Sequence, residues 1–367
     1  MRVRYGLRRL GIPFLLAATG LTPALAQEAR WYQLSEQVLQ LRQQGKAAEA
    51  IPLAQETVRV ARSTFGADNP HVGLSLNELG LLLKDTEKFA DAEAAYRSAL
   101  GINQKAYGDG STQVAAVINN IADLYRIEGR YPDAEKLFQQ AMAIQEKALG
   151  PNDPAVAVNA SNLALVYVAE GKYADADTLY RRVIAIDQQA KGQNDSSMAL
   201  DYGNLADLDE KQGKYAEAQT LFLQATAIDL KAHGNEHPIV ATDLANLGSV
   251  YVDEGRYSNA EPIFVRALAI DEKALGRTTP QSPGLRMGWL RFIVARAATP
   301  RLRPYSSSRW RRARGCWERI IRRWPPFWIT LADSSRTWGA MPRRRVFTVR
   351  QSTFERRRWE PRIQCWR

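Results

Sequence analysis

Asparagine recurs at intervals of 42 residues in one column of the sequence: Asn120, Asn162, Asn204 and Asn246. The positions one residue earlier in the period form a second column. It holds asparagine at its first two positions, Asn77 and Asn119, and other residues at the next three, Ser161, Gly203 and Ala245. A side-chain amide donates and accepts hydrogen bonds at once. Such columns are suited to binding the backbone of an extended peptide, or to tying neighbouring structural units together. Position alone leaves both readings open.

Groups for catalysis or metal binding are sparse. The three histidines are His71, His233 and His237. His71 and His237 fall in or just after a turn, so a turn or helix-start role outweighs metal ligation. Residues 27–276 contain no Walker-type phosphate loop, no Gly-x-Ser-x-Gly elbow and no His-Glu-x-x-His pair. We therefore expect no enzyme, no metal site and no cofactor.

The asparagine columns belong to a longer repeat. A Gly-(Lys/Arg)-Tyr turn recurs every 42 residues, with its glycines at Gly129, Gly171, Gly213 and Gly255. A second glycine column has the same period: Gly66, Gly108, Gly150, Gly192, Gly234 and Gly276. Two turns in each period leave two segments per unit, and glycine is the residue that most readily adopts the left-handed conformation that ends a helix.

Both segments have helical patterning. Val156, Leu163 and Tyr167 lie on one face of the first segment of their unit. Second segments share a small residue and, four positions later, an aromatic one: Ala92, Ala134, Ala176, Ala218 and Ala260, then Tyr96, Phe138, Tyr180, Phe222 and Phe264. A lone helix pair cannot bury such a face. The sequence therefore predicts an all-α solenoid of about six stacked units over residues 27–276, with a concave side.

This pattern resembles the tetratricopeptide repeat superfamily, and specifically the 42-residue repeats of kinesin light chains and many bacterial proteins. The resemblance is carried by Leu163-Ala164-x-x-Tyr167, Gly171-Lys172-Tyr173, Ala176 with Tyr180, and Ala148-Leu149-Gly150-Pro151 with Pro154. It extends over about residues 28–276 and implies a right-handed solenoid of helical pairs. The sequence departs from it at Asp209, where the repeat has Tyr, at Glu87, which replaces a turn glycine, and in the degenerate first unit.

The resemblance also implies where a ligand binds. First helices of such units line the concave groove, and their asparagines bind the backbone of an extended peptide. The matching residues here are Asn120, Asn162, Asn204 and Asn246, with Asn77 and Asn119 in the second column. The alternative is that these amides join adjacent repeats. Groove lysines that clamp a terminal carboxylate are not indicated, because the repeating cations lie in the turns.

The N-terminus has the pattern of an export signal. Arg2, Arg4, Arg8 and Arg9 precede an apolar stretch, and Ala24-Leu25-Ala26 supplies a small-x-small cleavage site before Gln27. We expect residues 1–26 to be a signal peptide and the mature protein to be periplasmic or secreted. After cleavage we expect no membrane partner.

Residues 277–367 differ in composition from the repeats. They hold 23 Arg, no Lys, 4 acidic residues and eight of the nine Trp. The whole chain carries +11, this tail +19 and residues 1–26 carry +4, so residues 27–276 carry −12. Arginine interleaved with tryptophan is compatible with nucleic-acid or anionic-membrane binding. Because the basic charge is confined to the ends, we do not expect nucleic acid as a partner of the repeats.

A different explanation of this tail is a shifted reading frame. Codons can be chosen for Arg277-Thr278-Thr279-Pro280 so that a one-base shift reads Ala-Asp-His-Pro, which is typical of the turn between units. Residues 317–323 and 339–345 can likewise be encoded so that one shifted frame reads repeat-like stretches. On this hypothesis the tail is out-of-frame, irregular sequence, and the last unit is left with an uncapped apolar face.

These features predict a non-enzymatic scaffold that binds a protein or peptide in the groove of a repeat solenoid. The alternative is the regulatory half of a larger protein, because similar bacterial arrays can precede a caspase-like peptidase domain that a frameshift would remove. A third alternative is a nucleic-acid or membrane binder that acts through the tail.

Overall fold

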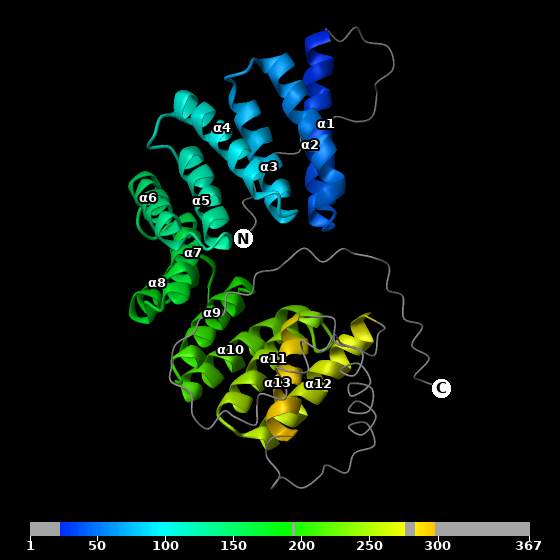
Figure 1. Cartoon of the computed structure of the whole chain (residues 1–367), viewed down its shortest axis with the longest axis vertical. Coiled ribbons are helices and arrows are strands. Elements are labelled where there is room, and N and C mark those ends of the chain that lie inside the picture. The colour runs from blue at the N-terminus through cyan, green and yellow to red at the C-terminus, as the bar shows by residue number, and fades with distance from the viewer. Residues whose placement is uncertain (1–22, 193–194, 276–282, 298–367) are drawn as a thin grey trace, which may run out of the picture.

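The computed structural model describes residues 23–192, 195–275 and 283–297 (Figure 1). These residues form six consecutive helix pairs and one further helix. The pairs are α1 (Pro23–Gln43) with α2 (Ala47–Phe65), α3 (Pro70–Asp85) with α4 (Phe89–Tyr107), α5 (Thr112–Ile127) with α6 (Tyr131–Leu149), α7 (Pro154–Glu170) with α8 (Tyr173–Lys191), α9 (Ser197–Lys211) with α10 (Tyr215–His233), and α11 (Pro238–Asp253) with α12 (Tyr257–Leu275). The last helix is α13 (Pro283–Ala297). The six-unit helical solenoid predicted from the period is confirmed.

Helix boundaries follow from local chemistry. Most first helices begin after a side chain that accepts a hydrogen bond from the free N–H groups of the first turn, as Asn69 does from the His71 N–H at 3.0 Å. Second helices end at a glycine with positive φ, for example Gly150 at 95°. The turn within each unit also has a positive φ, and at Glu87 this is a non-glycine residue with φ of 61°.

The core runs continuously from unit to unit. Alanines of the small column, Ala92 to Ala260, are fully buried and allow each pair of helices to approach closely. The aromatic residues four positions later are buried between one unit and the next. At Gly80 and Gly248 an added Cβ would lie 2.5 Å and 2.9 Å from the rings of Tyr96 and Phe264. Each unit therefore packs only on its neighbours, as expected of a solenoid.

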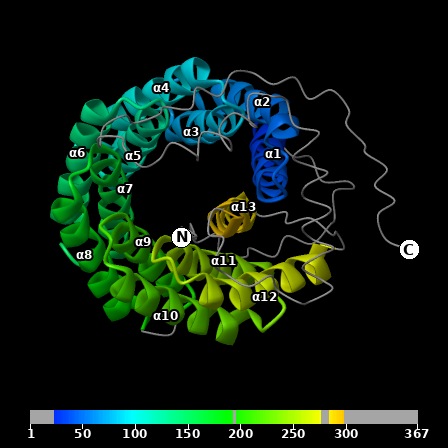
Figure 2. The ribbon, with the colours of Figure 1, turned by 60° about the horizontal axis from the view of Figure 1, so that its bottom comes forward.

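The solenoid is curved, so one layer of helices lies on its concave side and the other on its convex side. Figure 2 shows α1, α3, α5, α7, α9 and α11 on the inner side of the curve and the second helices on the outer side. We call the face formed by these first helices the inner surface. It is the face on which the sequence placed the asparagine columns.

Part of the tail differs from expectation. Residues 283–297 form α13, whose Leu285, Trp289 and Phe292 are buried against the last unit. The ring of Phe264 lies 5.8 Å from Trp289 and 5.7 Å from Phe292, so the end of the array is covered rather than bare. Unlike a regular first helix, α13 packs more on α11 than on α12, and Figure 2 places it inside the curve. The segments at 317–323 and 339–345, on which the hypothesis of a shifted reading frame rests, lie outside the described residues.

Candidate functional site

All six predicted asparagines lie on first helices, which form the inner layer of the curve. Asn77 belongs to α3, Asn119 and Asn120 to α5, Asn162 to α7, Asn204 to α9 and Asn246 to α11. They are half-buried, which is the exposure expected along a groove wall. The structure separates them into two groups by their hydrogen bonds.

Four asparagines pair with one another across neighbouring units. The Nδ2 of Asn120 donates to the Oδ1 of Asn77 at 2.8 Å, and the Nδ2 of Asn162 donates to the Oδ1 of Asn119 at 3.1 Å. These bonds join α3 to α5 and α5 to α7. For these four residues the geometry is that of the alternative reading, in which the amides tie adjacent repeats together. We call the set of contacts between successive first helices the inner ladder.

Asn204 and Asn246 have no such partner. By the spacing of the two pairs above, Asn204 would bond position 161 and Asn246 would bond position 203, but these positions hold Ser161 and Gly203. Within the described part of the chain neither amide makes a side-chain hydrogen bond. Both amides are half-buried, so each keeps part of its surface exposed.

Ion pairs extend the inner ladder in the first half of the array. Arg42 of α1 bonds Glu78 of α3 at 2.6 Å, and Lys84 of α3 bonds Asp123 of α5. Arg126 also bonds Asp123, at 2.7 Å. Burial raises the pKa of the Asp123 carboxyl, but Lys84 and Arg126 outweigh it, so this pKa lies below its ordinary value. The sequence did not reveal these pairs, because the partners are on different helices.

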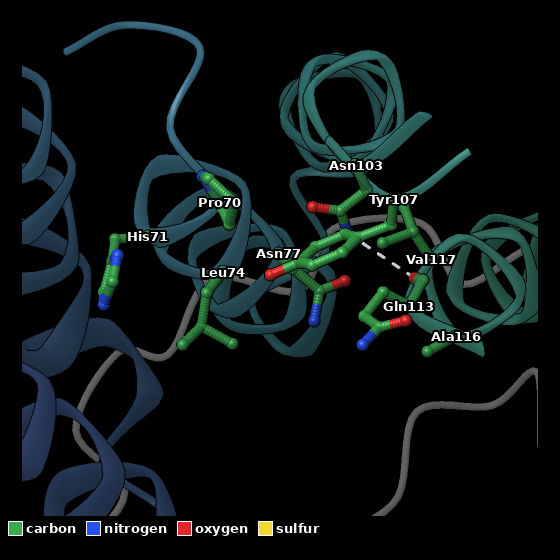
Figure 3. A pocket seen from close by; sticks show the side chains of 9 residues that line it. All are labelled: Pro70, His71, Leu74, Asn77, Asn103, Tyr107, Gln113, Ala116 and Val117. Carbon is green, nitrogen blue, oxygen red and sulfur yellow. Dashed lines mark hydrogen bonds between the residues drawn. The ribbon is translucent and has the colours of Figure 1, made fainter. Parts of the chain in front are cut away.

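A small cavity opens beside Asn77, where α3, the end of α4 and the start of α5 meet (Figure 3). Its volume is about 180 Å³. Leu74 and Tyr107 contribute apolar surface, and both are exposed, at 43% and 46%. The Nδ2 of Asn103 donates to the main-chain oxygen of Gln113 at 3.5 Å beside it. The sequence did not predict this cavity, which forms only where three helices of two units meet.

Carboxyl groups gather in the second half of the array. On α7 the only charged residue is Glu170, whereas α9 carries Asp201, Asp207, Asp209 and Glu210 against a single cation, Lys211. Burial raises the pKa of Glu210 to about 7, and the neighbouring Asp253 acts in the same direction. Arg291 of α13 contacts both of these carboxyls, at 3.9 Å from the Oε1 of Glu210 and as an ion pair with Asp253.

The histidines have structural surroundings. His71 stacks on Phe65 with ring centroids 4.4 Å apart, and His237 caps α11 and stacks on His233 at 4.7 Å. Among the described residues, no three His, Cys, Asp or Glu side chains are grouped so that they could hold a metal ion. The described helices also include none with the length and apolar character needed to cross a membrane.

Comparisons with known proteins identify a repeat family and solved structures with a similar fold. The sequence profile described as "Tetratricopeptide repeat" matches residues 34–105, 113–189 and 197–273. No curated protein matches the chain. The crystal structure of BtubC (BKLC) from P. vanneervenii is similar, with a TM-score of 0.54 and 23% identity over 68% of this chain and 94% of that chain.

Two further solved structures are similar to the chain. The TPR-like repeats of a Podosopora anserina protein assigned to a kinesin light chain are 25% identical, with a TM-score of 0.48, and the match covers 55% of this chain and 96% of that chain. The apo form of the quorum sensor NprR from B. thuringiensis has a TM-score of 0.53 at 11% identity, covering 80% of this chain and 74% of that one.

Proposed function

Because the chain belongs to the tetratricopeptide repeat family, we propose that it is a scaffold that binds an extended segment of another protein along its inner surface. The observation that carries the proposal is that Asn204 and Asn246, one period apart on neighbouring first helices, make no side-chain hydrogen bond to any described residue. An amide in this position satisfies a peptide unit of a ligand in any sequence context.

The proposal divides the six asparagines by role. Asn204 and Asn246 are the ligand contacts. The other four (Asn77, Asn119, Asn120 and Asn162) hold the first helices at a fixed spacing, because their amides already bond one another. The binding segment is therefore the inner surface of α9 together with the part of α11 that α13 leaves exposed, and the first half of the array supports it.

Selection of peptides from a displayed random library by the full chain, followed by measurement of their affinity, tests the proposal. For a selected peptide, Asn204→Ala combined with Asn246→Ala should weaken binding by roughly 5- to 100-fold, the effect of two hydrogen bonds. The melting temperature should be unchanged. The matched control is Asn120→Ala with Asn162→Ala, which should lower the melting temperature and affect binding less.

Two results would overturn the proposal. One is a selection that enriches no peptide above background. The other is a double variant at Asn204 and Asn246 that binds the selected peptides as well as the unchanged chain does.

We also propose that the chain is exported and that its mature form begins at Gln27. The basic residues, the apolar stretch and Ala24-Leu25-Ala26 support this. Cleavage after Ala26 cuts the first turn of α1 ahead of Trp31, the first buried residue of that helix. N-terminal sequencing of the protein from the producing cell should give Gln27, and Met1 on the folded protein would contradict export.

A further inference from the structure

One pair of buried positions recurs at the contacts between units, one on a second helix and one on the following first helix. In the contact of α6 with α7 the pair is Gln145 and Asn159, which are 8% and 1% exposed. The Nδ2 of Asn159 donates to the Oε1 of Gln145 at 2.8 Å. Two amides are complementary and uncharged, so this contact does not depend on protonation.

The same positions hold two carboxyls at the next two contacts. One period later Asp187 of α8 meets Asp201 of α9, and two periods later Asp229 of α10 meets Asp243 of α11. Asp187, Asp201 and Asp229 are only 5%, 7% and 2% exposed. Two ionised carboxylates facing each other in such surroundings repel one another and lose hydration.

The other charged groups around each pair offset its repulsion only in part. Lys191 bonds the Oδ2 of Asp187 at 2.6 Å, but Asp195, at the start of α9, adds a further negative charge near Asp201. At the second pair the Nε2 of His233 lies 3.7 Å from the Oδ1 of Asp229, and the ring of His237 stacks on that of His233. One oxygen of each carboxyl has no donor within the described protein: Asp187 Oδ1, Asp201 Oδ2, Asp229 Oδ1 and Asp243 Oδ2. A proton shared within each pair would supply the donor that is missing.

The direction of the titration follows from burial. Burial, and then the neighbouring Asp187, raise the pKa of Asp201 to about 7. Burial, and then Asp229, raise the pKa of Asp243 to about 7 as well. An aspartate in the unfolded chain has a pKa of about 3.9. The stabilisation by the bound proton is therefore complete below about pH 4 and is lost as the pH rises through about 7.

We propose that the α8–α9 and α10–α11 contacts are proton-dependent joints, which a proton shared by each aspartate pair holds closed and which loosen when both carboxyls ionise. The α6–α7 contact, with its amide pair, keeps the same strength throughout. This proposal goes beyond the proposed function, because the pH dependence of these two contacts does not depend on which ligand the chain binds. The same pH dependence also governs the helices that carry Asn204 and Asn246.

Hydrogen exchange of the full chain, followed segment by segment by mass spectrometry and expressed as protection relative to the intrinsic rate at each pH, tests the proposal. Between mildly acidic and mildly alkaline pH, protection in α8–α9 and in α10–α11 should fall by at least about tenfold, the factor that one unit of pKa shift represents. Protection in α6–α7 should stay constant. Equal protection at both pH values in α8–α9 would overturn the proposal.

The chain provides its own matched controls. Asp187→Gln with Asp201→Asn copies the amide pair into the α8–α9 contact. It should sharply reduce the pH dependence there, leaving only the part that Asp209 and Glu210 of α9 contribute, while α10–α11 keeps its own. Gln145→Asp with Asn159→Asp should introduce the dependence into α6–α7. If the first double variant keeps the full pH dependence of α8–α9, the carboxyl pair is not its cause. That variant removes charge from a buried site, so it tests the proposal even if the second variant fails to fold.

Discussion

The side-chain nitrogen of Asn162 donates a 3.1 Å hydrogen bond to the side-chain oxygen of Asn119, and so joins α7 to α5 across the inner surface. The equivalent bond between Asn204 and position 161 does not form, because that position holds Ser161. The inner ladder of amides thus stops between the fourth and fifth units.

The ladder can be tested by exchanging these two residues. Asn119→Ser, which copies Ser161, should lower the free energy of unfolding by about 0.5–1.5 kcal/mol, because Asn162 loses its acceptor. Ser161→Asn should have the opposite effect by giving Asn204 a partner, and it should also weaken any ligand that Asn204 binds. Urea unfolding and peptide affinity are the measurements. A Ser161→Asn variant with unchanged stability would argue against the ladder.

Asp209 lies near the end of α9, at the position where α5, α7 and α11 have Tyr125, Tyr167 and Tyr251. In the third unit Tyr125 donates to Glu93 at 2.6 Å and lies 3.6 Å below the guanidinium of Arg130. In the fifth unit Asp209 is 2% exposed, and its Oδ1 lies 3.7 Å from the Nζ of Lys214. Burial raises the pKa of Asp209, while Lys214 acts in the opposite direction.

We predict that Asp209→Tyr raises the free energy of unfolding by about 1–3 kcal/mol, by removing a buried carboxyl and restoring the cation–π contact with Lys214. Because the pKa of Asp209 is raised in the folded state, its ionised form opposes folding more strongly as the pH rises. The gain in melting temperature should therefore be larger at alkaline than at acidic pH. The reverse change, Tyr167→Asp, is the control and should destabilise the fourth unit.

Glu87 is the one non-glycine residue with positive φ among the described residues, at 61°, where the other units have glycine at 72–78°. We expect Glu87→Gly to stabilise the chain by roughly 1 kcal/mol, because a residue with a Cβ is strained in this conformation. At Gly171 an added Cβ would meet no atom within 4 Å. Gly171→Ala should therefore lose stability through backbone strain alone. Thermal unfolding measures both changes, and a destabilising Glu87→Gly would show that the Glu87 side chain matters more than the strain.

Trp289 tests whether α13 caps the array. Its indole is 2% exposed, and its Nε1–H has no acceptor within the described protein. Trp289→Ala should lower the free energy of unfolding by about 3–5 kcal/mol, whereas Trp289→Phe, which keeps an aromatic ring and removes the unpaired N–H, should be nearly neutral. Hydrogen exchange should locate the loss in α11, α12 and α13. A neutral Trp289→Ala would mean that α13 does not contribute to the cap.

The sequence was sufficient for the repeat, because glycine, alanine and aromatic columns in one 42-residue phase define turns and packing together. It did not reveal α13, whose apolar Leu285, Trp289 and Phe292 stand among arginines in a segment of different composition. The asparagine pairs were also hidden. Asn77 and Asn120 are 43 residues apart, one more than the period, so they belong to different columns. Asp187 and Asp201 meet only when two helices pack.

The uneven inner ladder also has a mechanical consequence. In a solenoid each unit contacts only its neighbours, so small changes of angle at successive contacts add along the array. Amide and ion pairs join the first helices from α1 to α7, whereas α9 and α11 are joined through Arg291 of α13, which contacts Glu210 of α9 and Asp253 of α11. The stiffness of the second half therefore depends on α13 staying docked against the last unit. An applied load that pulls α13 away will let the second half stretch before the first.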